Sequence, residues 1–183
     1  MDDIVKQAMA KWPDVPDCYG WLGLGARGDW YMRDDRVQAL GGFTSAIPGV
    51  KGSRLLHEKL ITFIQRNYQA DAQGRWFFQN GPQRVFVELE VTPWVWRIQP
   101  DLSVQAHTGE HTVCTVCLVD EHGWLYLETP LGLGLVHTQD VGLAANALES
   151  GLWPQQTVLR ADLPIRYRYI TSPLQESRLL QKA

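Results

Sequence analysis

The sequence predicts an α+β fold, made mainly of antiparallel sheets from repeated hairpins, with a helix packed on each half of the chain. Two patterns support this class. Short runs of β-branched and aromatic residues alternate with glycine-containing turns, which is typical of hairpins. Between them lie segments with apolar residues three and four positions apart, which is typical of helices that pack on a sheet. The 183 residues are 45% hydrophobic, which is enough to bury a substantial core.

The N-terminal half, residues 1–100, is expected to begin with a helix and a hairpin. Asp2 is placed to cap the helix, which ends near Lys11 because two prolines follow closely. The hairpin covers about 21–32, with aromatic residues on both sides of a glycine-containing turn. The glycine-rich stretch 34–52, which also contains a proline, is interpreted as a loop.

A second helix and a long hairpin complete this half. Ser53 is expected to cap a helix at about 54–68. The apolar residues at helical spacing are Leu56, Leu60, Phe63 and Ile64. After a turn at 71–74, the dipeptide Asn80-Gly81 is a strong signal for a tight hairpin turn.

The strand at 83–91 supplies the candidate binding surface. Its residues alternate, with valines and one leucine on the face expected to be core. If the alternation continues past Pro93, charged and aromatic side chains share the opposite face, and indoles flanked by charges suit partner binding. A bulge at Pro93 would instead turn both tryptophans into the core. The candidate binding residues are Arg84, Phe86, Glu88, Glu90, Trp94 and Trp96.

The C-terminal half, residues 101–183, is expected to repeat the pattern of hairpin and helix and to end in a strand. The hairpin covers about 112–128. Thr138 is placed to cap a last helix that stops at Gly151. A final strand is expected at 165–170, followed by a polar tail that frays.

The final strand would place Arg166 and Arg168 on one face, next to each other. Two neighbouring guanidinium groups would suit an anionic ligand. The alternative is an edge strand whose charged side chains prevent pairing with other chains.

Three tryptophans suggest an internal repeat. Trp30, Trp76 and Trp124 each follow a turn glycine directly or after one residue, at intervals of about 50 residues. If the hairpin is repeated, each of these tryptophans begins the second strand of a hairpin. A chance arrangement remains the alternative, because a strand aromatic commonly follows a turn glycine.

Four side chains that can bind zinc lie close together in the sequence, namely His107, His111, Cys114 and Cys117. The segment around the cysteines is β-branched, and residues three apart on a strand face opposite sides. We therefore expect buried, reduced thiols and no metal, no cofactor and no catalytic residue here.

The strand at 83–91, together with the hairpin and the helix that precede it, resembles a bacterial family of uncharacterised proteins that is described only as a domain of unknown function. The resemblance covers about 20–150 and is carried by Gly28-Asp29-Trp30, by the helix after Ser53, and by the strand that runs into Pro93-Trp94. The chain is a divergent member, with Val91 and Trp94 where the family usually has aspartate and phenylalanine. The resemblance implies an α+β fold of repeated motifs and a link to signal transduction.

The charge pattern limits the classes of partner. The net charge is −3 and no block of like charges occurs, so neither nucleic acid nor a membrane surface is expected as a partner. The acidic start Met1-Asp2-Asp3 is unlike a signal peptide, and an odd number of cysteines is unlike a disulfide framework, so a cytoplasmic location is expected.

The richness in tryptophan favours a binding or regulatory module that recognises a small molecule or a partner protein. The alternative function is a small hydrolase or transferase that uses a histidine with a thiol or a carboxylate. The sequence leaves the oligomeric state open, and a homodimer is compatible with it.

Overall fold

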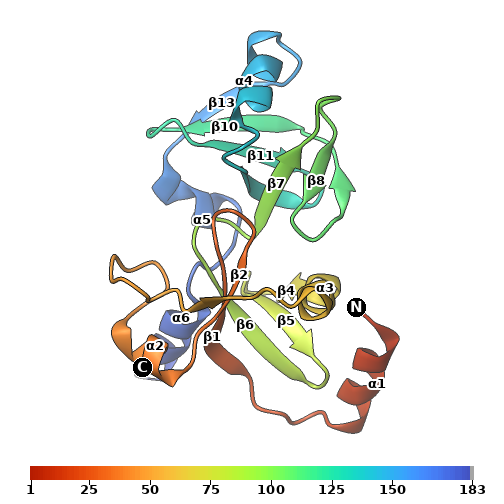
Figure 1. The fold of residues 1–183 in the computed structure, drawn as a ribbon, viewed down its shortest axis with the longest axis vertical. Coiled ribbons are helices and arrows are strands. Elements are labelled where there is room, and N and C mark those ends of the chain that lie inside the picture. Colours follow the sequence, from red (N-terminus) through yellow and green to blue (C-terminus); the bar gives the residue numbers. More distant parts are fainter. Residues whose placement is uncertain (182–183) are drawn as a thin grey trace. The chain divides into compact units, whose positions relative to one another are not determined.

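The strands of the protein form two sheets, accompanied by several helices (Figure 1). The computed structural model describes residues 1–181. The combination of largely antiparallel sheets and helices confirms the expected α+β class. Within the described residues, no helix has the length and apolar character needed to cross a membrane.

The chain divides into two units by its internal contacts. Unit 1 contains residues 1–25, 29–90 and the segment from Tyr169 onward, and unit 2 contains residues 26–28 and 91–168. The expected halves, 1–100 and 101–183, differ from these units at two main places. Residues 91–100 belong to unit 2, and the segment from Tyr169 belongs to unit 1.

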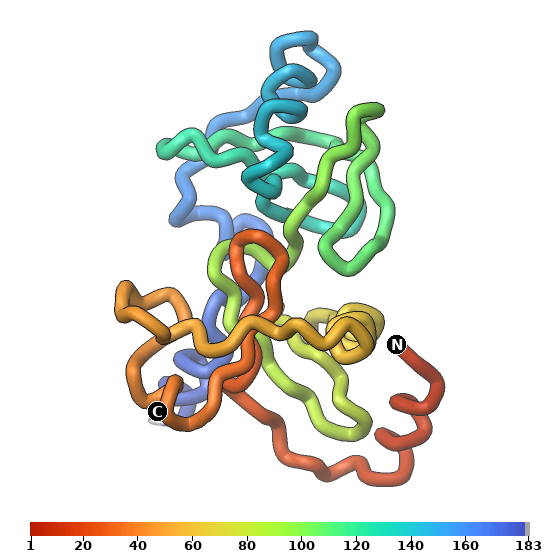
Figure 2. Tube along the Cα trace, viewed as in Figure 1, coloured from red at the N-terminus to blue at the C-terminus, as the bar shows by residue number. Residues whose placement is uncertain are grey.

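Unit 1 contains the first sheet. Its elements are α1 (Asp3–Lys11), β1 (Cys18–Leu24), β2 (Trp30–Met32), α2 (Asp35–Leu40), β3 (Ser53–Arg54), α3 (Glu58–Arg66), β4 (Tyr68–Ala70), β5 (Trp76–Asn80), β6 (Gln83–Leu89) and α6 (Pro173–Leu180). The strand order is β3-β2-β1-β6-β5-β4. Figure 2 shows the blue C-terminal segment returning to this sheet, where α6 packs against β1 and β6.

Unit 2 contains the second sheet. Its elements are β7 (Trp94–Ile98), β8 (Val104–Ala106), β9 (His111–Thr112), β10 (Val116–Asp120), β11 (Leu125–Thr129), β12 (Gly132–Val136), α4 (Val141–Glu149), β13 (Gln155–Val158), a 3-10 turn (Arg160–Asp162) and α5 (Leu163–Arg166). The strand order is β13-β10-β11-β12-β7-β8-β9.

Both sheets have the same plan. In each, two antiparallel meanders of three strands meet through one parallel pair, which joins the first strand of the first meander to the last strand of the second. In unit 1 that pair is β1 and β6, and in unit 2 it is β7 and β12. The second sheet adds β13, which pairs in parallel with β10 at the edge. The shared plan means that β4 and β5 correspond to β10 and β11.

The corresponding turns after β4 and β10 are built alike. Each begins with an aspartate whose Oδ1 accepts from the backbone N–H groups two and four residues later. Asp71 does this in unit 1 and Asp120 in unit 2. Each turn has a glycine in the left-handed region as its fourth residue, at Gly74 and Gly123.

The tryptophan repeat follows this plan only in part, because Trp76 and Trp124 belong to corresponding hairpins but Trp30 does not. Trp30 and Trp76 begin the second strands of their hairpins, whereas Trp124 lies one residue before β11. Trp30 is fully buried, while Trp124 is partly exposed. By strand order, the first hairpin of unit 1 corresponds to β7 and β8, which is not the hairpin that carries Trp124.

Two expectations for residues 34–68 are wrong. The supposed loop contains α2, because the Asp34 side chain accepts from the N–H of Val37 and caps a helix. The main helix starts later than Ser53, which lies in β3. His57 occupies the N-cap of α3, and its Nδ1 accepts from the N–H of Leu60 at 3.2 Å.

The C-terminal expectations are also corrected. The segment expected as a strand at 165–170 overlaps α5, whose first turn contains a proline, so Arg166 and Arg168 do not alternate along a strand. The tail forms α6, because Ser172 caps it and Pro173 occupies its first turn. The N-cap of α4 is Asp140, two residues after Thr138.

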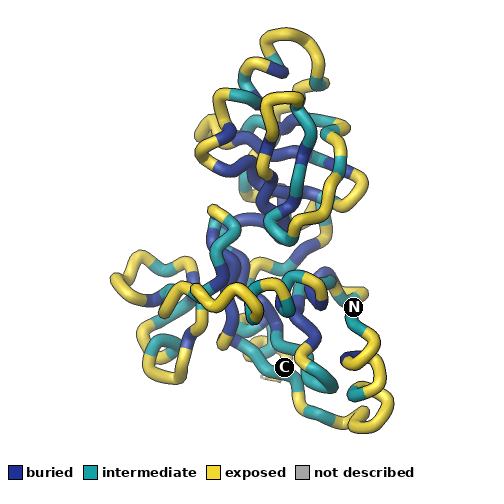
Figure 3. The backbone as a smooth tube through the Cα atoms, turned by 45° about the vertical axis from the view of Figure 1, so that its right-hand side comes forward, coloured by how far each residue is buried: buried dark blue, intermediate teal, exposed yellow. Residues whose placement is uncertain are grey.

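The core of each unit lies along its central strands. Figure 3 shows these strands largely in dark blue and α1 largely in yellow. In unit 1 the strand β6 is buried from Phe86 to Leu89, on both faces. A strand that is covered on both faces has no solvated side for a binding surface.

Candidate functional site

The structure divides the predicted binding residues between the two sheets. Arg84, Phe86, Glu88 and Glu90 lie in or just after β6, in unit 1, whereas Trp94 and Trp96 lie in β7, in unit 2. The chain leaves the first sheet after β6 and enters the second sheet at β7. Pro93, which cannot donate a hydrogen bond to a strand ladder, lies directly before β7. The six residues therefore do not form a single strand face.

The expected exposure of Phe86 and Glu88 is wrong. Phe86 is fully buried and stacks on Tyr19, with ring centroids 4.6 Å apart. The Glu88 carboxylate accepts from the hydroxyl of Ser172 and, at 3.0 Å, from the N–H of Leu174. Glu88 thus holds the first turn of α6 on the sheet, where a carboxylate is favoured by the helix dipole.

Arg84 and Glu90 are committed to ion pairs. The Arg84 guanidinium donates to both oxygens of Asp17, at 2.8 and 2.7 Å. The Glu90 carboxylate accepts from the ammonium of Lys51 at 2.6 Å. Both ion pairs connect segments of unit 1 that are distant in the sequence, so they help to hold these segments together.

The two tryptophans of β7 are core residues, as in the alternative interpretation of the segment after Pro93. Trp96 is fully buried and its Nε1 donates to the carbonyl of Leu127 at 3.0 Å. Trp94 stacks on Trp96 with centroids 5.7 Å apart, and its Nε1 donates to Leu131. The pair packs against Gly134, where an added Cβ would overlap the indole of Trp96.

The four zinc-competent side chains are spread across the second sheet. His111 lies in β9, at one edge of the sheet, whereas Cys117 lies in β10, with four strands between them. Burial lowers the pKa of His107 to about 3, so this imidazole is neutral at physiological pH. Among the described residues, no group of three or more histidine, cysteine and acidic side chains is placed to hold a metal.

The three thiols are free and shielded. Burial raises the pKa of Cys18, that of Cys114 to about 12 and that of Cys117 to about 11. Since the thiolate is the nucleophile, these values count against a thiol-based hydrolase or transferase.

We therefore expect iodoacetamide at pH 8 to alkylate Cys114 and Cys117 at least about 100-fold more slowly in the native than in the denatured protein, and Cys18 more slowly as well, because a raised pKa leaves little thiolate. Mass spectrometry over time gives the rates for Cys18, Cys114 and Cys117 separately. After denaturation without reductant, all three should react. A native thiol that reacts as fast as free cysteine would contradict this expectation and would favour the alternative function, a hydrolase or transferase that uses a thiol.

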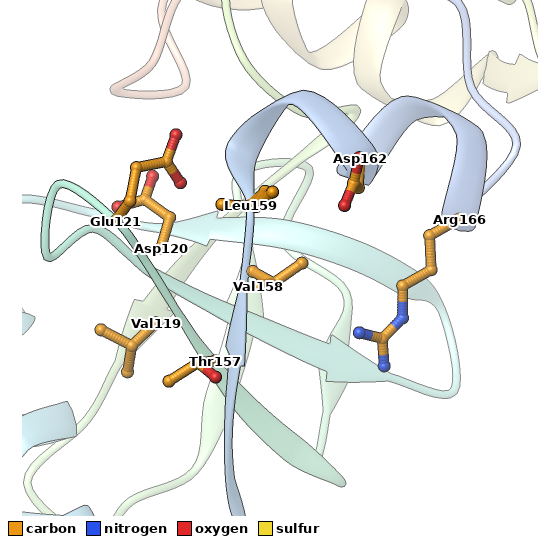
Figure 4. A pocket seen from close by; sticks show the side chains of 8 residues that line it. All are labelled: Val119, Asp120, Glu121, Thr157, Val158, Leu159, Asp162 and Arg166. Carbon is orange, nitrogen blue, oxygen red and sulfur yellow. The ribbon is translucent and has the colours of Figure 1, made fainter.

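The candidate site is a groove at the end of the parallel pair β10 and β13. Asp120 pairs with Val158, so both strands end at the same level, and the 3-10 turn and α5 follow β13 directly. Space beyond the carboxyl ends of parallel strands is a common position for binding sites. The groove has a volume of about 460 Å³ and is lined by Val119, Asp120, Glu121, Thr157, Val158, Leu159, Asp162 and Arg166 (Figure 4).

Three carboxylates and one guanidinium line this groove, so it carries a formal excess of negative charge. In Figure 4, Asp120 and Glu121 lie on one side of the chain from Thr157 to Leu159, and Asp162 and Arg166 lie on the other. The groove therefore passes across the end of β13.

Two of the acids are fixed by hydrogen bonds. Asp120 accepts from two backbone N–H groups of its turn and from the hydroxyl of Tyr126 at 2.9 Å. Glu121 accepts from the N–H of Arg160 at 2.8 Å, and this bond is the main cause of its lowered pKa. Glu121 is therefore ionised at neutral pH and ties the turn to the segment after β13.

The other two charged side chains are exposed, and one of them is held less tightly. Asp162 and Arg166 are exposed, as is Glu121, but among the described residues no hydrogen bond holds the Asp162 carboxylate. The Arg166 guanidinium donates to the side-chain oxygen of Gln156 at 3.0 Å and lies over the ring of Tyr167. Asp162 is thus the carboxylate that is best placed to meet an incoming cation.

Sequence analysis missed this site. It rests on the parallel pairing of β10 with β13, two strands that are about 40 residues apart along the chain, and such pairing leaves no local pattern. The polar segment 155–158 was not assigned to a strand. The one available signal is the acidic pair Asp120-Glu121, which lies within the expected hairpin at 112–128.

The family model described as "Protein of unknown function (DUF2946)" matches residues 1–177. Among solved structures, the crystal structure of a DUF1285 family protein from Silicibacter pomeroyi DSS-3 is similar, with 10% sequence identity, a TM-score of 0.47, and coverage of 80% of this chain and 84% of that chain. No curated protein matches the sequence. The expected resemblance to a family of unknown function is thus confirmed, and the chain belongs to the family described as "Protein of unknown function (DUF2946)".

Proposed function

We propose that the protein is a cytoplasmic binding module that takes a cationic ligand in the groove at the ends of β10 and β13. The observation that carries this proposal is the lining of the groove, which contains three carboxylates and one guanidinium. Two of those carboxylates are held by hydrogen bonds, so the site is organised before a ligand arrives.

The ligand class follows from the chemistry of the lining. Carboxylates recognise amines and guanidinium groups through charge-assisted hydrogen bonds. Val158 and Leu159 provide an apolar surface that suits the methylene chain of such a ligand. We propose further that binding serves signal transduction, the role that the resemblance to an uncharacterised bacterial family implies.

Agmatine, which carries a guanidinium and an amine on a short methylene chain, is the probe for this proposal. In a titration followed by NMR, we expect the backbone amides of Glu121, Thr157 and Asp162 to shift. Asp162→Asn should weaken binding several-fold, because it removes the accessible carboxylate. Arg166→Gln should strengthen it, because it removes the only like charge in the lining.

Glu110→Gln is the matched control. It also removes one exposed carboxylate from unit 2, but it lies just before β9, at the opposite edge of the sheet from β13. It should leave agmatine binding unchanged. Equal weakening by the Asp162 and Glu110 variants would indicate general attraction to a negative protein and would overturn the proposed site.

A further inference from the structure

The strand β13 has a free edge beside the groove. Among the described strands, β13 has one neighbour, β10, and it stands at the end of the sheet. Its residues Gln155, Gln156 and Thr157 are exposed. Natural edge strands are commonly protected by lysine, proline or a covering element. Within β13 the sequence Gln-Gln-Thr-Val contains no charge and no proline.

The direction of the backbone groups at this edge follows from the pairing. Cys117 pairs with Gln155, and its N–H donates to the carbonyl of Pro154 at 2.8 Å. In a parallel pair, the residue directly opposite turns its own N–H and C=O away from its partner. Gln155 and, two residues on, Thr157 therefore present their backbone N–H and C=O groups to the free edge.

Exposed apolar side chains flank this edge. Leu152 precedes β13 and is 62% exposed, Leu159 follows it and is 57% exposed, and Ile165 of α5 is 82% exposed. An extended segment that pairs with β13 would find hydrogen bonds along the edge, apolar contacts at both ends and the acidic groove at the carboxyl end.

From this juxtaposition we propose that the occupant of the groove is a basic segment of a partner protein, which adds to the edge of β13 as an extra strand and places a lysine or arginine side chain among Glu121 and Asp162. This inference rests on the proposed function and names its partner. The excess of carboxylates in the lining selects a basic segment by charge complementarity.

Charge also argues against a second copy of this chain as the occupant. If the β13 strands of two copies paired about a two-fold axis, the two sheets would become one, and both acidic grooves would lie on it. Like charges placed together disfavour association. A dimer that is abolished by a change in β13 would therefore overturn the proposal in favour of self-association.

The test uses the full-length protein and the peptide acetyl-Val-Thr-Lys-Thr-Val-amide. We expect this peptide to bind at least tenfold more tightly than agmatine, because a few backbone hydrogen bonds are added to the same cation contact. Methylation of the peptide backbone nitrogens that face β13 should reverse the gain. Replacing the peptide lysine by glutamate should abolish binding.

The matched variants are Gln155→Pro and Gln156→Pro. Gln155→Pro removes an N–H that faces the free edge and lies outside the groove lining, so it should reduce peptide affinity at least tenfold and leave agmatine binding and the unfolding temperature nearly unchanged. Gln156→Pro removes an N–H that faces β10 and should destabilise the sheet. If Gln155→Pro also destabilises the protein, the methylated peptide still tests the strand contact.

The outcomes separate the two proposals. If agmatine binds but the peptide binds no better, strand addition is wrong and the cation site stands. If methylation leaves peptide affinity unchanged, the peptide uses the groove without the edge, and strand addition is again wrong. If neither probe shifts the groove amides, both proposals fail.

Discussion

Replacing Trp96 by alanine is expected to lower the free energy of unfolding by about 3 to 5 kcal/mol, the range for removing a buried aromatic side chain. Trp96 is fully buried in the centre of the second sheet and its indole N–H is bonded to Leu127. The substitution would leave a cavity between Trp94 and Gly134 and remove the hydrogen bond that the indole donates to the carbonyl of Leu127. Equilibrium unfolding in urea measures the loss.

Trp12→Ala is the control for this prediction. Trp12 also carries a large indole, but it follows α1 and is 51% exposed. Its loss should change the free energy of unfolding by about 0.5 kcal/mol or less, as is usual for surface positions. If the two variants lost the same stability, the stacked pair in β7 would not be the core that the structure describes.

The hairpins were predictable because their signals are local. The Asn80-Gly81 dipeptide indicated the turn between β5 and β6, and the Asp71 turn was recognised from its composition. In the same way, Asp2 marked the start of α1, although its side chain makes no capping hydrogen bond. Each of these signals lies within a few residues of the element that it marks.

The face of β6 was mispredicted because alternation assumes that one side of a strand meets water. β6 is a central strand, with β1 and β5 as neighbours, and α6 from the C-terminus packs against it. The signal for α6 was present, since Ser172-Pro173 followed by Gln175 is a helix start. It was overlooked because the tail was interpreted as polar and frayed.

The candidate groove could not be predicted at all, since it depends on an arrangement of distant segments. Asp120 and Asp162 are placed together only after β13 pairs with β10. The alternation of arginine and tyrosine at 166–169 indicated a strand, but the chain there follows a proline in the first turn of α5. A short helix of four residues leaves little periodicity to detect.

Replacing Arg33 by methionine is expected to destabilise unit 1 by about 3 kcal/mol or more, because each buried carbonyl that loses its donor costs about 1 to 3 kcal/mol. Arg33 is fully buried and donates to the carbonyls of Gly20, Gly41 and Val50. Methionine fills much of the same space but satisfies none of these carbonyls. Arg54→Met, which removes an exposed guanidinium from β3, is the control and should cost less than about 1 kcal/mol.

The pH dependence of the Arg33→Met variant tests its coupling to Glu88. Burial raises the pKa of Glu88, while the bonds from Ser172 and Leu174 and the charges of Arg33 and Arg178 lower it. Because the net shift is upward, the folded protein holds this proton more tightly than the unfolded chain, and stability falls as pH rises from about 4.3 through the folded-state pKa.

Without Arg33 the pKa of Glu88 should rise further, so the loss of stability continues to higher pH. Urea unfolding between pH 4 and pH 8 should therefore show a gap between wild type and Arg33→Met that widens as the pH increases. Adding Glu88→Gln to the variant should remove the widening, since no proton is then exchanged at that site. A gap of constant size at every pH would show that the Glu88 carboxylate does not sense the Arg33 charge, and that the three carbonyl bonds account for the whole effect.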